Sequence, residues 1–337
     1  PRYENLKTKM VEVIEWAIND APLAKTHPSP AGLVAAIGNF DGVHRGHQKV
    51  IAAATDAAQR DNLTSAVITF DPHPREFFRQ DEVPFHLADR LEKDRLLSNL
   101  LGHSAKAKVI HIRFDDTLRT TDARHFISHV LMNLGVRQLF AGTDFAFGRG
   151  RGGDLETINC AGKDVGLKAT AIPLLVDDNS AVISSSRIRA ALQAGDPESA
   201  AVMLGRDWAV TGTVIRGDAR GRGIGFPTAN IALGPLQHPA FGVYAVEVDL
   251  EDSNGQVRYL GNGVANIGIR PTVQNRGVLC ETHLFDQDLD LYGERLLVRL
   301  KAFLRQEQKF SGIDELIRQI AVDAKKARQI LPPLSLG

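Results

Sequence analysis

The stretch Gly-Asn-Phe-Asp-Gly-Val-His-Arg-Gly-His at residues 38–47 decides the fold of the first half of this chain. The apolar run Leu33–Ile37 before it is suited to a buried strand, and the Ala-rich segment after it has apolar residues at helical spacing. The stretch therefore lies where a strand passes into a helix, and a helix N-terminus presents unpaired N–H groups to an anion. Because His44 and His47 lie three residues apart in this turn, it indicates a site that handles nucleotide phosphate.

Length and composition indicate a two-domain enzyme. The chain has 337 residues, which favours more than one hydrophobic core. Its 40 basic and 40 acidic residues balance, which argues against a dedicated nucleic-acid binder. No apolar run approaches the roughly 20 residues of a membrane span, and the first residues lack a signal-peptide core. Cys160 and Cys280 match no metal spacing. We expect a cytoplasmic enzyme with no nucleic-acid or membrane partner, and the sequence names no protein partner.

The first half of the chain alternates strand-like and helical patterns. Such alternation predicts an α/β domain with a parallel, Rossmann-like sheet and helices on both faces. The expected strands are Leu33–Ile37, Ser65–Phe70, Lys108–Ile112, Gln138–Ala141 and Lys168–Leu175. The expected helices are residues 46–60, 88–101, 121–134 and 153–165. Residues 1–31 are interpreted as an N-terminal extension with a short amphipathic helix at Val11, Val13, Ile14 and Trp16.

The second half reads as strands without intervening helices. In Gly242–Leu250 apolar residues alternate with charged ones, which is typical of a half-buried antiparallel strand. We expect an antiparallel β-barrel followed by a helix at Ile313–Ile330, whose apolar residues form one stripe. The other expected strands are Trp208–Arg216, Val257–Ile267, Leu279–Phe285 and Arg295–Leu304. The domains are therefore placed at residues 1–31, 32–205 and 206–337.

A second segment, Ser184–Arg189, supports phosphate binding in the first domain. Its serines are suited to cap a helix, but a helix dipole does not favour arginines in the first turns. Together with His-Arg-Gly-His, this segment resembles the nucleotidyltransferase superfamily, and the loops at residues 69–74 and 142–148 resemble its flavin-synthesising branch. The resemblance implies that His44 and His47 act in adenylyl transfer. It implies ATP contacts from Gly38, Phe40, Asp41, Gly42, Gly46, Ser185 and Arg189, and FMN contacts from Asp71, Asp144, Phe145 and Phe147.

A glycine-rich loop opens the second domain. Its glycines allow backbone N–H groups to surround phosphate, and the oxygens of Thr228 and Asn230 suit Mg²⁺. A hairpin connection is the structural alternative, although the loop is long for one. The loop closely resembles the riboflavin kinase signature, as does Cys280–Leu284, where that family places a catalytic glutamate. The resemblance implies that Glu281 is the general base; as a structural carboxylate it would need a partner such as Arg299. It implies kinase ATP contacts from Gly217, Arg222, Gly223, Gly225, Pro227, Thr228 and Asn230, with Mg²⁺ held by Thr228 and Asn230.

Both resemblances together cover about residues 33–330 and point to the bifunctional riboflavin kinase/FMN adenylyltransferase family. The implied activities are phosphorylation of riboflavin to FMN and adenylylation of FMN to FAD, with ATP and Mg²⁺ in each and flavins as substrates and products. Two alternatives stay open. One is a nucleotidyltransferase with another phosphate acceptor and a non-catalytic flavin-binding barrel. The other is a nucleic-acid or interaction protein, which the Gly-Arg loops suggest and the balanced charge disfavours.

Overall fold

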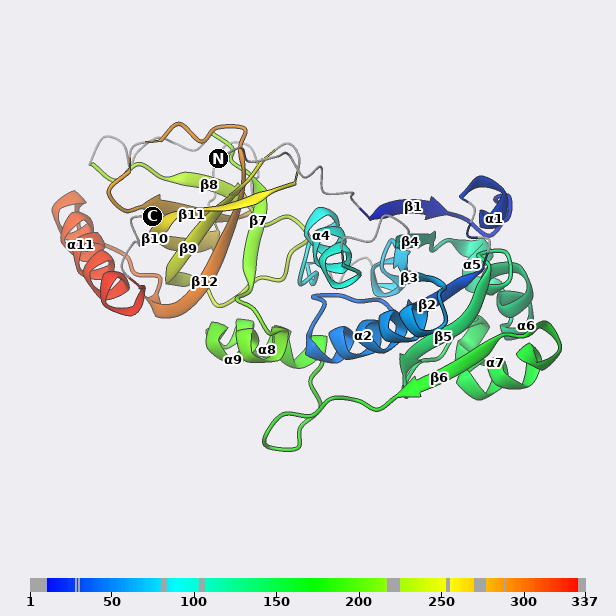
Figure 1. Cartoon of the computed structure of the whole chain (residues 1–337). Helices are drawn as coiled ribbons and strands as arrows, with labels where there is room; N and C mark the ends of the chain where they lie inside the picture. The colour runs from blue at the N-terminus through cyan, green and yellow to red at the C-terminus, as the bar shows by residue number, and fades with distance from the viewer. Residues whose placement is uncertain are drawn as a thin grey trace. The chain divides into compact units, whose positions relative to one another are not determined.

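The computed structural model in Figure 1 describes residues 11–27, 29, 31–79, 84–102, 107–216, 225–252, 255–269, 277–287 and 289–332. The chain divides into two compact units. The first combines Pro1–Val83 with Arg90–Ile183, and the second combines Pro84–Asp89 with Ser184–Gly337. The chain thus enters the second unit briefly at residues 84–89 before it returns to the first.

The first unit is built on a six-stranded sheet in the order β1-β4-β3-β2-β5-β6. Every neighbouring pair in it is parallel, which confirms the predicted α/β class. The strand order reverses at β2, and ligands of such sheets bind beyond the carboxyl ends of the strands near that point. The strands are β1 (Glu12–Trp16), β2 (Leu33–Ile37), β3 (Thr64–Asp71), β4 (Lys108–Arg113), β5 (Val136–Gly142) and β6 (Lys168–Ile172).

The N-terminal prediction was wrong in one respect. The residues Glu12–Trp16 are a strand, not an amphipathic helix, and they pair in parallel with β4 at the edge of the sheet. Ile14 and Trp16 are buried while Val13 and Glu15 are more exposed, which is the period of a strand. Val13 and Ile14 are β-branched and suit a strand better than a helix.

Helices cover both faces of this sheet, as predicted. Along β2, Leu33, Ala35 and Ile37 pack into one apolar cluster and Val34 and Ala36 into another. The first cluster includes η2 and α7, and the second includes α2 and α4. The helices are α1 (Leu23–Thr26), α2 (Arg45–Arg60), α3 (Pro74–Phe78), α4 (Arg90–Leu100), α5 (Asp116–Thr120), α6 (Ala123–His125), η2 (Phe126–Leu131, a π-helix), η3 (Arg149–Arg151), α7 (Leu155–Gly162) and η4 (Lys163–Val165).

The second unit contains an antiparallel barrel of six strands in the order β7-β12-β9-β10-β11-β8. Its two edges meet where Ile215, just after β7, bridges to Asn230 in β8, so the sheet is nearly closed. This confirms the predicted barrel, although β8 was not predicted as a strand. The strands are β7 (Ala209–Thr213), β8 (Ala229–Ala232), β9 (Gly242–Glu251), β10 (Val257–Ile269), β11 (Val278–Leu284) and β12 (Arg295–Gln306).

Among the described residues of the second unit, the helices are α8 (Ser185–Gln193), α9 (Pro197–Leu204) and α11 (Ile313–Ile330). The last confirms the predicted C-terminal helix, and it packs against β9, β10 and β12 (Figure 1). Because α8 and α9 pack with the barrel, the division between the compact units lies at Ser184. The sequence-based division at residue 206 marks the beginning of the barrel itself. Within the described ranges, no helix has the length and apolar character that a membrane span requires.

Candidate active sites

The His-Arg-Gly-His turn lies at the carboxyl end of β2 and begins α2. His44 is the N-cap residue, and its Nδ1 accepts a hydrogen bond from the backbone N–H of His47 at 3.3 Å. A nitrogen that accepts carries no proton, so the proton of a neutral His44 ring is on Nε2. The turn reaches this geometry through positive φ angles at Phe40, Gly42 and Val43. The local sequence therefore fixes both the backbone of the turn and the tautomer of His44.

The two predicted catalytic histidines lie face to face. Their ring centroids are 3.5 Å apart with planes at 18°, and the edge of Phe40 meets His47 at 5.3 Å. A Cβ on Gly46 would lie 3.1 Å from the His44 ring, so this position has little room for a side chain. Burial lowers the pKa of His47 well below its usual value, and the nearby His44 and Lys93 lower it further. His47 is therefore a neutral imidazole at pH 7.

Among the other predicted nucleotide-binding residues of the turn, Phe40 and Asp41 are buried, and a Cβ on Gly38 would lie 3.3 Å from the Phe40 ring. Gly38 and Asp41 lie in the same turn as the histidine pair. The turn thus assembles Gly38, Phe40, Asp41, Gly42, His44, Gly46 and His47 from one continuous segment.

Lys93 is a member of this region that the sequence patterns did not reveal. It belongs to α4, and its Nζ donates to Thr69 Oγ1 at 3.1 Å and to the carbonyl oxygen of Asn39 at 3.4 Å. Thr69 Oγ1 in turn donates to the same carbonyl oxygen at 3.1 Å. These contacts place the ammonium at the carboxyl ends of β2 and β3.

The predicted FMN residues lie in two loops of the first unit. Asp71 ends β3 and forms an ion pair with Arg90. Asp144 is exposed just after β5, whereas Phe147 is buried, with its ring 4.9 Å from that of Phe126 and 5.7 Å from that of Phe145. A cavity of about 480 Å³ lies at the carboxyl ends of β1, β3 and β4. Its lining includes Asp71, Trp16, Phe77, His111 and Phe114.

The Ser184–Arg189 segment lies in the second unit. Ser184 caps α8 through its side chain, which accepts from the backbone N–H of Arg187 at 3.4 Å, and Ser185 is the first residue of the helix. Arg189 is buried, and its Nε donates to the carbonyl oxygen of Phe85 at 2.7 Å while its guanidinium lies over the Phe85 ring at 5.3 Å. Arg189 therefore holds the segment 84–89 against the second unit.

The predicted kinase residues meet on β8 and β11. Glu281 is the direct cross-strand partner of Asn230 on one side and of Asn266 in β10 on the other. Directly paired residues in an antiparallel sheet point to the same face, so Glu281 lies between two amide side chains. Asn266 was not among the predicted site residues, since only the strand pairing brings it beside Glu281. Arg299, considered as a structural partner for Glu281, forms ion pairs with Glu247 and Asp249.

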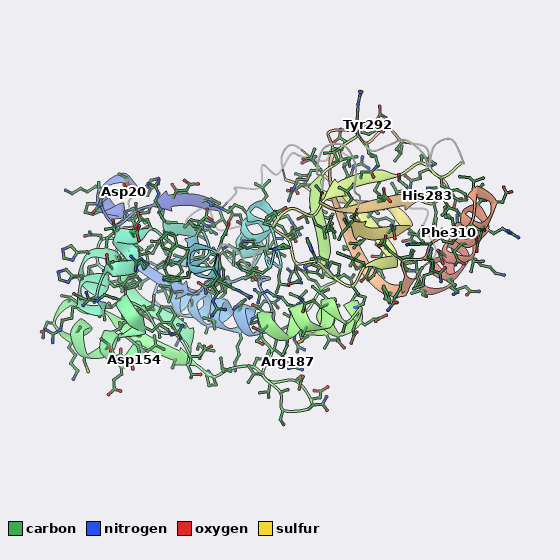
Figure 2. The ribbon with its side chains drawn as sticks, turned by 180° about the vertical axis from the view of Figure 1, so that it is seen from behind. Asp20, Asp154, Arg187, His283, Tyr292 and Phe310 are labelled. Carbon is green, nitrogen blue, oxygen red and sulfur yellow. The ribbon has the colours of Figure 1, made fainter. Side chains whose placement is uncertain are left out.

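Thr228 and Pro227 line a small cavity of about 40 Å³ at the end of the barrel. Asn230 Nδ2 donates to the carbonyl oxygen of Thr228 at 3.3 Å, which leaves Asn230 Oδ1 to accept. His283 Nδ1 lies 2.9 Å from the carbonyl oxygen of Pro227; since a carbonyl only accepts, the imidazole donates. Tyr292 also lines the cavity. His283 and Tyr292 are both labelled in Figure 2.

Only some of the predicted residues of the glycine-rich loop lie within the described ranges. Gly225 has a φ of 85°, which suits glycine. The predicted contacts Gly217, Arg222 and Gly223 lie outside the described residues. Gln287 lines the cavity, and its Nε2 donates to the carbonyl oxygen of Leu260 at 2.7 Å.

Oxygen donors in this region fit Mg²⁺. Within the part of the chain that the structure describes, no group of three or more His, Cys, Asp or Glu side chains could hold a metal ion. Mg²⁺ needs no such cage, since it favours a few protein oxygens completed by phosphate and water. The Thr228 hydroxyl and Asn230 Oδ1 supply two such oxygens, two residues apart.

Comparison with known proteins identifies both units. Residues 26–187 match the family model for FAD synthetase, and residues 204–331 match that for riboflavin kinase. A bifunctional riboflavin kinase/FMN adenylyltransferase from Escherichia coli is 40% identical over 299 residues, which cover 88% of this chain and 92% of that protein. This chain belongs to the bifunctional riboflavin kinase/FMN adenylyltransferase family. It phosphorylates riboflavin to FMN and adenylylates FMN to FAD, with ATP as the donor in both reactions.

A second curated relative agrees with this family membership, and a solved structure shares the fold over most of the chain. The enzyme of the same name from Bacillus subtilis is 38% identical over 314 residues, which cover 90% of this chain and 95% of that protein. A solved structure from Streptococcus pneumoniae, named as a macrolide-efflux protein, has a TM-score of 0.77 at 27% identity and covers 94% of this chain and 99% of its own. The family excludes the open alternative of a different phosphate acceptor with a non-catalytic barrel.

Proposed function

We propose that the two reactions take place at separate sites, with adenylyl transfer at His44 and His47 and riboflavin phosphorylation at Glu281. The stacked histidines at the start of α2 support the first assignment. Adenylyl transfer joins a phosphate oxygen of FMN to the α-phosphorus of ATP, and pyrophosphate leaves. This reaction needs alignment and neutralisation of charge on the phosphates. The Nε2–H of His44 and the N–H groups of the first turn of α2 are donors suited to that role.

The flavin and triphosphate contacts of this site are also part of the proposal. Asp71, Asp144, Phe145 and Phe147 bind FMN, and Ser185 and Arg189 contact the phosphates of ATP. The position of Asp71 at the carboxyl end of β3, on the wall of the large cavity, supports its assignment. Arg189 Nε already donates to the carbonyl oxygen of Phe85. The proposal therefore requires the same guanidinium to contact the nucleotide as well.

In the kinase barrel, Glu281 accepts the proton of the ribityl hydroxyl while the hydroxyl oxygen attacks the γ-phosphorus of ATP and ADP leaves. The observation that carries this assignment is the cross-strand pairing of Glu281 with Asn230. It brings the general base beside the residue proposed, with Thr228, to hold Mg²⁺. When bound, Mg²⁺ neutralises charge on the transferred phosphoryl group. Gly217, Arg222, Gly223, Gly225 and Pro227 form the rest of the proposed ATP loop.

We place the enzyme in the cytoplasm, where its substrate ATP is available, and FMN passes between the sites through solution. The assignment is tested with Glu281→Gln, which keeps the side-chain shape and removes the base. This variant is expected to form no FMN from riboflavin yet to convert supplied FMN to FAD at the wild-type rate. Retained riboflavin phosphorylation, or equal loss of both activities, would show that Glu281 is not the base of a separate kinase site.

A further inference from the structure

One half-buried cation in the first unit, Lys93, has no role in the motifs of this family that the sequence carries. Lys93 lies on α4, yet its Nζ reaches across to Thr69 Oγ1 and to the carbonyl oxygen of Asn39. Both acceptors belong to the carboxyl ends of neighbouring strands, where α/β sheets bind ligands. Since Asn39 is the second residue of the His-Arg-Gly-His stretch, the ammonium lies beside the adenylyl-transfer turn.

Lys93 forms no direct ion pair with a described carboxylate. Its Nζ contacts a hydroxyl and a carbonyl oxygen, and among the described residues no carboxylate lies within ion-pair distance of it. Charges that are largely withdrawn from water are ordinarily paired in proteins. An ammonium has three N–H donors, so one remains for a ligand. Because none of the nearby carboxylates pairs directly with Nζ, its remaining N–H donor can bind an anion.

The surroundings of Lys93 place this donor in the reaction centre. Burial lowers the pKa of Lys93, the carboxylates of Asp41, Asp71 and Asp94 oppose that effect, and Arg90 adds to it. Lys93 in turn contributes to the low pKa of His47. The ammonium is therefore near the histidine pair on one side and near Asp71, proposed above to bind FMN, on the other.

We propose that Lys93 is a catalytic residue of FMN adenylylation that donates a hydrogen bond to a phosphate oxygen of the reacting pair. The reaction brings two anions together, the phosphate of FMN and the α-phosphate of ATP. A fixed positive charge between them reduces their repulsion and stabilises the charge that develops on the transferred group. Lys93 contributes charge and transfers no proton, so bond formation to the α-phosphorus and departure of pyrophosphate stay as described above. This role rests on the assignment of adenylyl transfer to His44 and His47.

The test compares Lys93→Met, which keeps the length of the side chain and removes the charge, with Lys93→Arg, which keeps a charge. Lys93→Met is expected to lower kcat/KM for FAD formation from FMN by about 10² to 10³. Riboflavin phosphorylation by the same full-length chain is expected to stay within about twofold. Lys93→Arg is expected to recover at least about a tenth of the wild-type rate. The matched control is Lys49→Met in α2, whose exposed Nζ contacts only the carbonyl oxygen of Pro173 in the described structure, and it is expected to leave both activities unchanged.

Steady-state kinetics show whether Lys93 contacts the phosphate of FMN or the α-phosphate of ATP. Together with thermal unfolding, they also distinguish both from a purely structural role. A selective rise in KM for FMN assigns the hydrogen bond to the FMN phosphate, and a selective rise in KM for ATP assigns it to the α-phosphate. Full FAD formation by Lys93→Met would overturn the proposal. So would loss of activity in Lys93→Met and Lys93→Arg alike with a lowered thermal midpoint of the first unit, because that result describes a structural lysine. His47→Asn, measured alongside, tests the underlying site assignment separately.

Discussion

The imidazole rings of His44 and His47 stack at a centroid distance of 3.5 Å, and the backbone N–H of His47 donates to Nδ1 of His44. One residue therefore serves two purposes. His44 caps α2 with one ring nitrogen, and we propose that its other nitrogen donates to substrate. Because structure and chemistry use different atoms of the same ring, substitutions can separate them.

The first prediction uses this separation. Asn is among the best N-cap residues, whereas Ala is poor, so His44→Asn retains the cap and His44→Ala does not. We expect both variants to lose FAD formation by about 10² or more, and only His44→Ala to lose about 1 kcal/mol of stability. Urea unfolding together with FAD formation from FMN measures the two effects. Equal stability of the two variants would refute the capping role.

The second prediction concerns pH. The folded state holds the pKa of His47 well below its usual value, whereas the unfolded chain binds a proton near pH 6.5. As the pH falls through that value, the unfolded state takes up a proton that the folded state does not, so this contribution to stability is lost on acidification. His47→Asn removes it, and the variant should lose stability less steeply between pH 7.5 and 5.5, by up to about 1.4 kcal/mol per pH unit.

Trp16 lies in the first unit and can report on its unfolding once Trp208, in the second unit, is replaced. We would measure urea unfolding by Trp16 fluorescence in a Trp208→Phe background, with and without His47→Asn, at each pH. If stability falls with pH equally in the Trp208→Phe protein and in its His47→Asn variant, His47 titrates normally in the folded state.

The third prediction concerns the metal in the kinase site. Asn230→Leu removes the proposed amide ligand of Mg²⁺ at nearly constant volume. We expect the Mg²⁺ concentration for half-maximal FMN formation to rise about tenfold, equivalent to about 1.4 kcal/mol. The Mg²⁺ dependence of FAD formation from supplied FMN provides the control within the same protein, and it should not change. A parallel shift in both reactions would argue against a metal ligand specific to the barrel.

The fourth prediction concerns the attachment of α11 to the barrel. Asp323 is 2% exposed, and its carboxylate pairs with Arg305 at 2.8 Å. Asp323→Ala leaves the guanidinium unpaired and should cost about 3–5 kcal/mol. The exposed pair of Asp286 and Arg328, at 2.7 Å, offers a matched control. Asp286→Asn suits the positive φ of 56° at this position and should cost less than about 1 kcal/mol in urea unfolding.

The sequence predicted those parts of the fold that periodicity specifies. The strands β2 and β9 have clear patterns, and both were placed correctly. The prediction that β9 is half-buried was wrong, because Glu247 and Asp249 on its second face are buried in ion pairs with Arg299. The edge strand β1 was assigned the wrong structure because five residues satisfy a helical and an alternating pattern almost equally, and its pairing with β4 decides between them. The pairing of Ile215 with Asn230, which nearly closes the barrel, is likewise a long-range contact without a local signal.

Continuous motifs allowed candidate site residues to be predicted, and the candidates Lys93 and Asn266 lie outside the motifs from which those predictions were made. His44 and His47 occupy one turn, so sequence alone indicates that they lie close to each other. Lys93 lies in the charged run Arg-Leu-Glu-Lys-Asp-Arg at residues 90–95, which is typical of a solvated helix face. Asn266 becomes a neighbour of Glu281 only through strand pairing. The segment 84–89 has no pattern that predicts its packing with the second unit, where Trp208 Nε1 donates to the carbonyl oxygen of Leu87 at 2.8 Å.

The measurement that tests two separate sites most directly is complementation between two full-length variants. His47→Asn alone should convert riboflavin and ATP with Mg²⁺ into FMN and stop, and Glu281→Gln alone should leave riboflavin unchanged. If FMN made at one site reaches the other through solution, an equimolar mixture of the two variants should form FAD from riboflavin. Failure of the mixture to form FAD, while Glu281→Gln still converts supplied FMN, would contradict transfer through solution. Loss of the same single activity in both variants would contradict the two-site account itself.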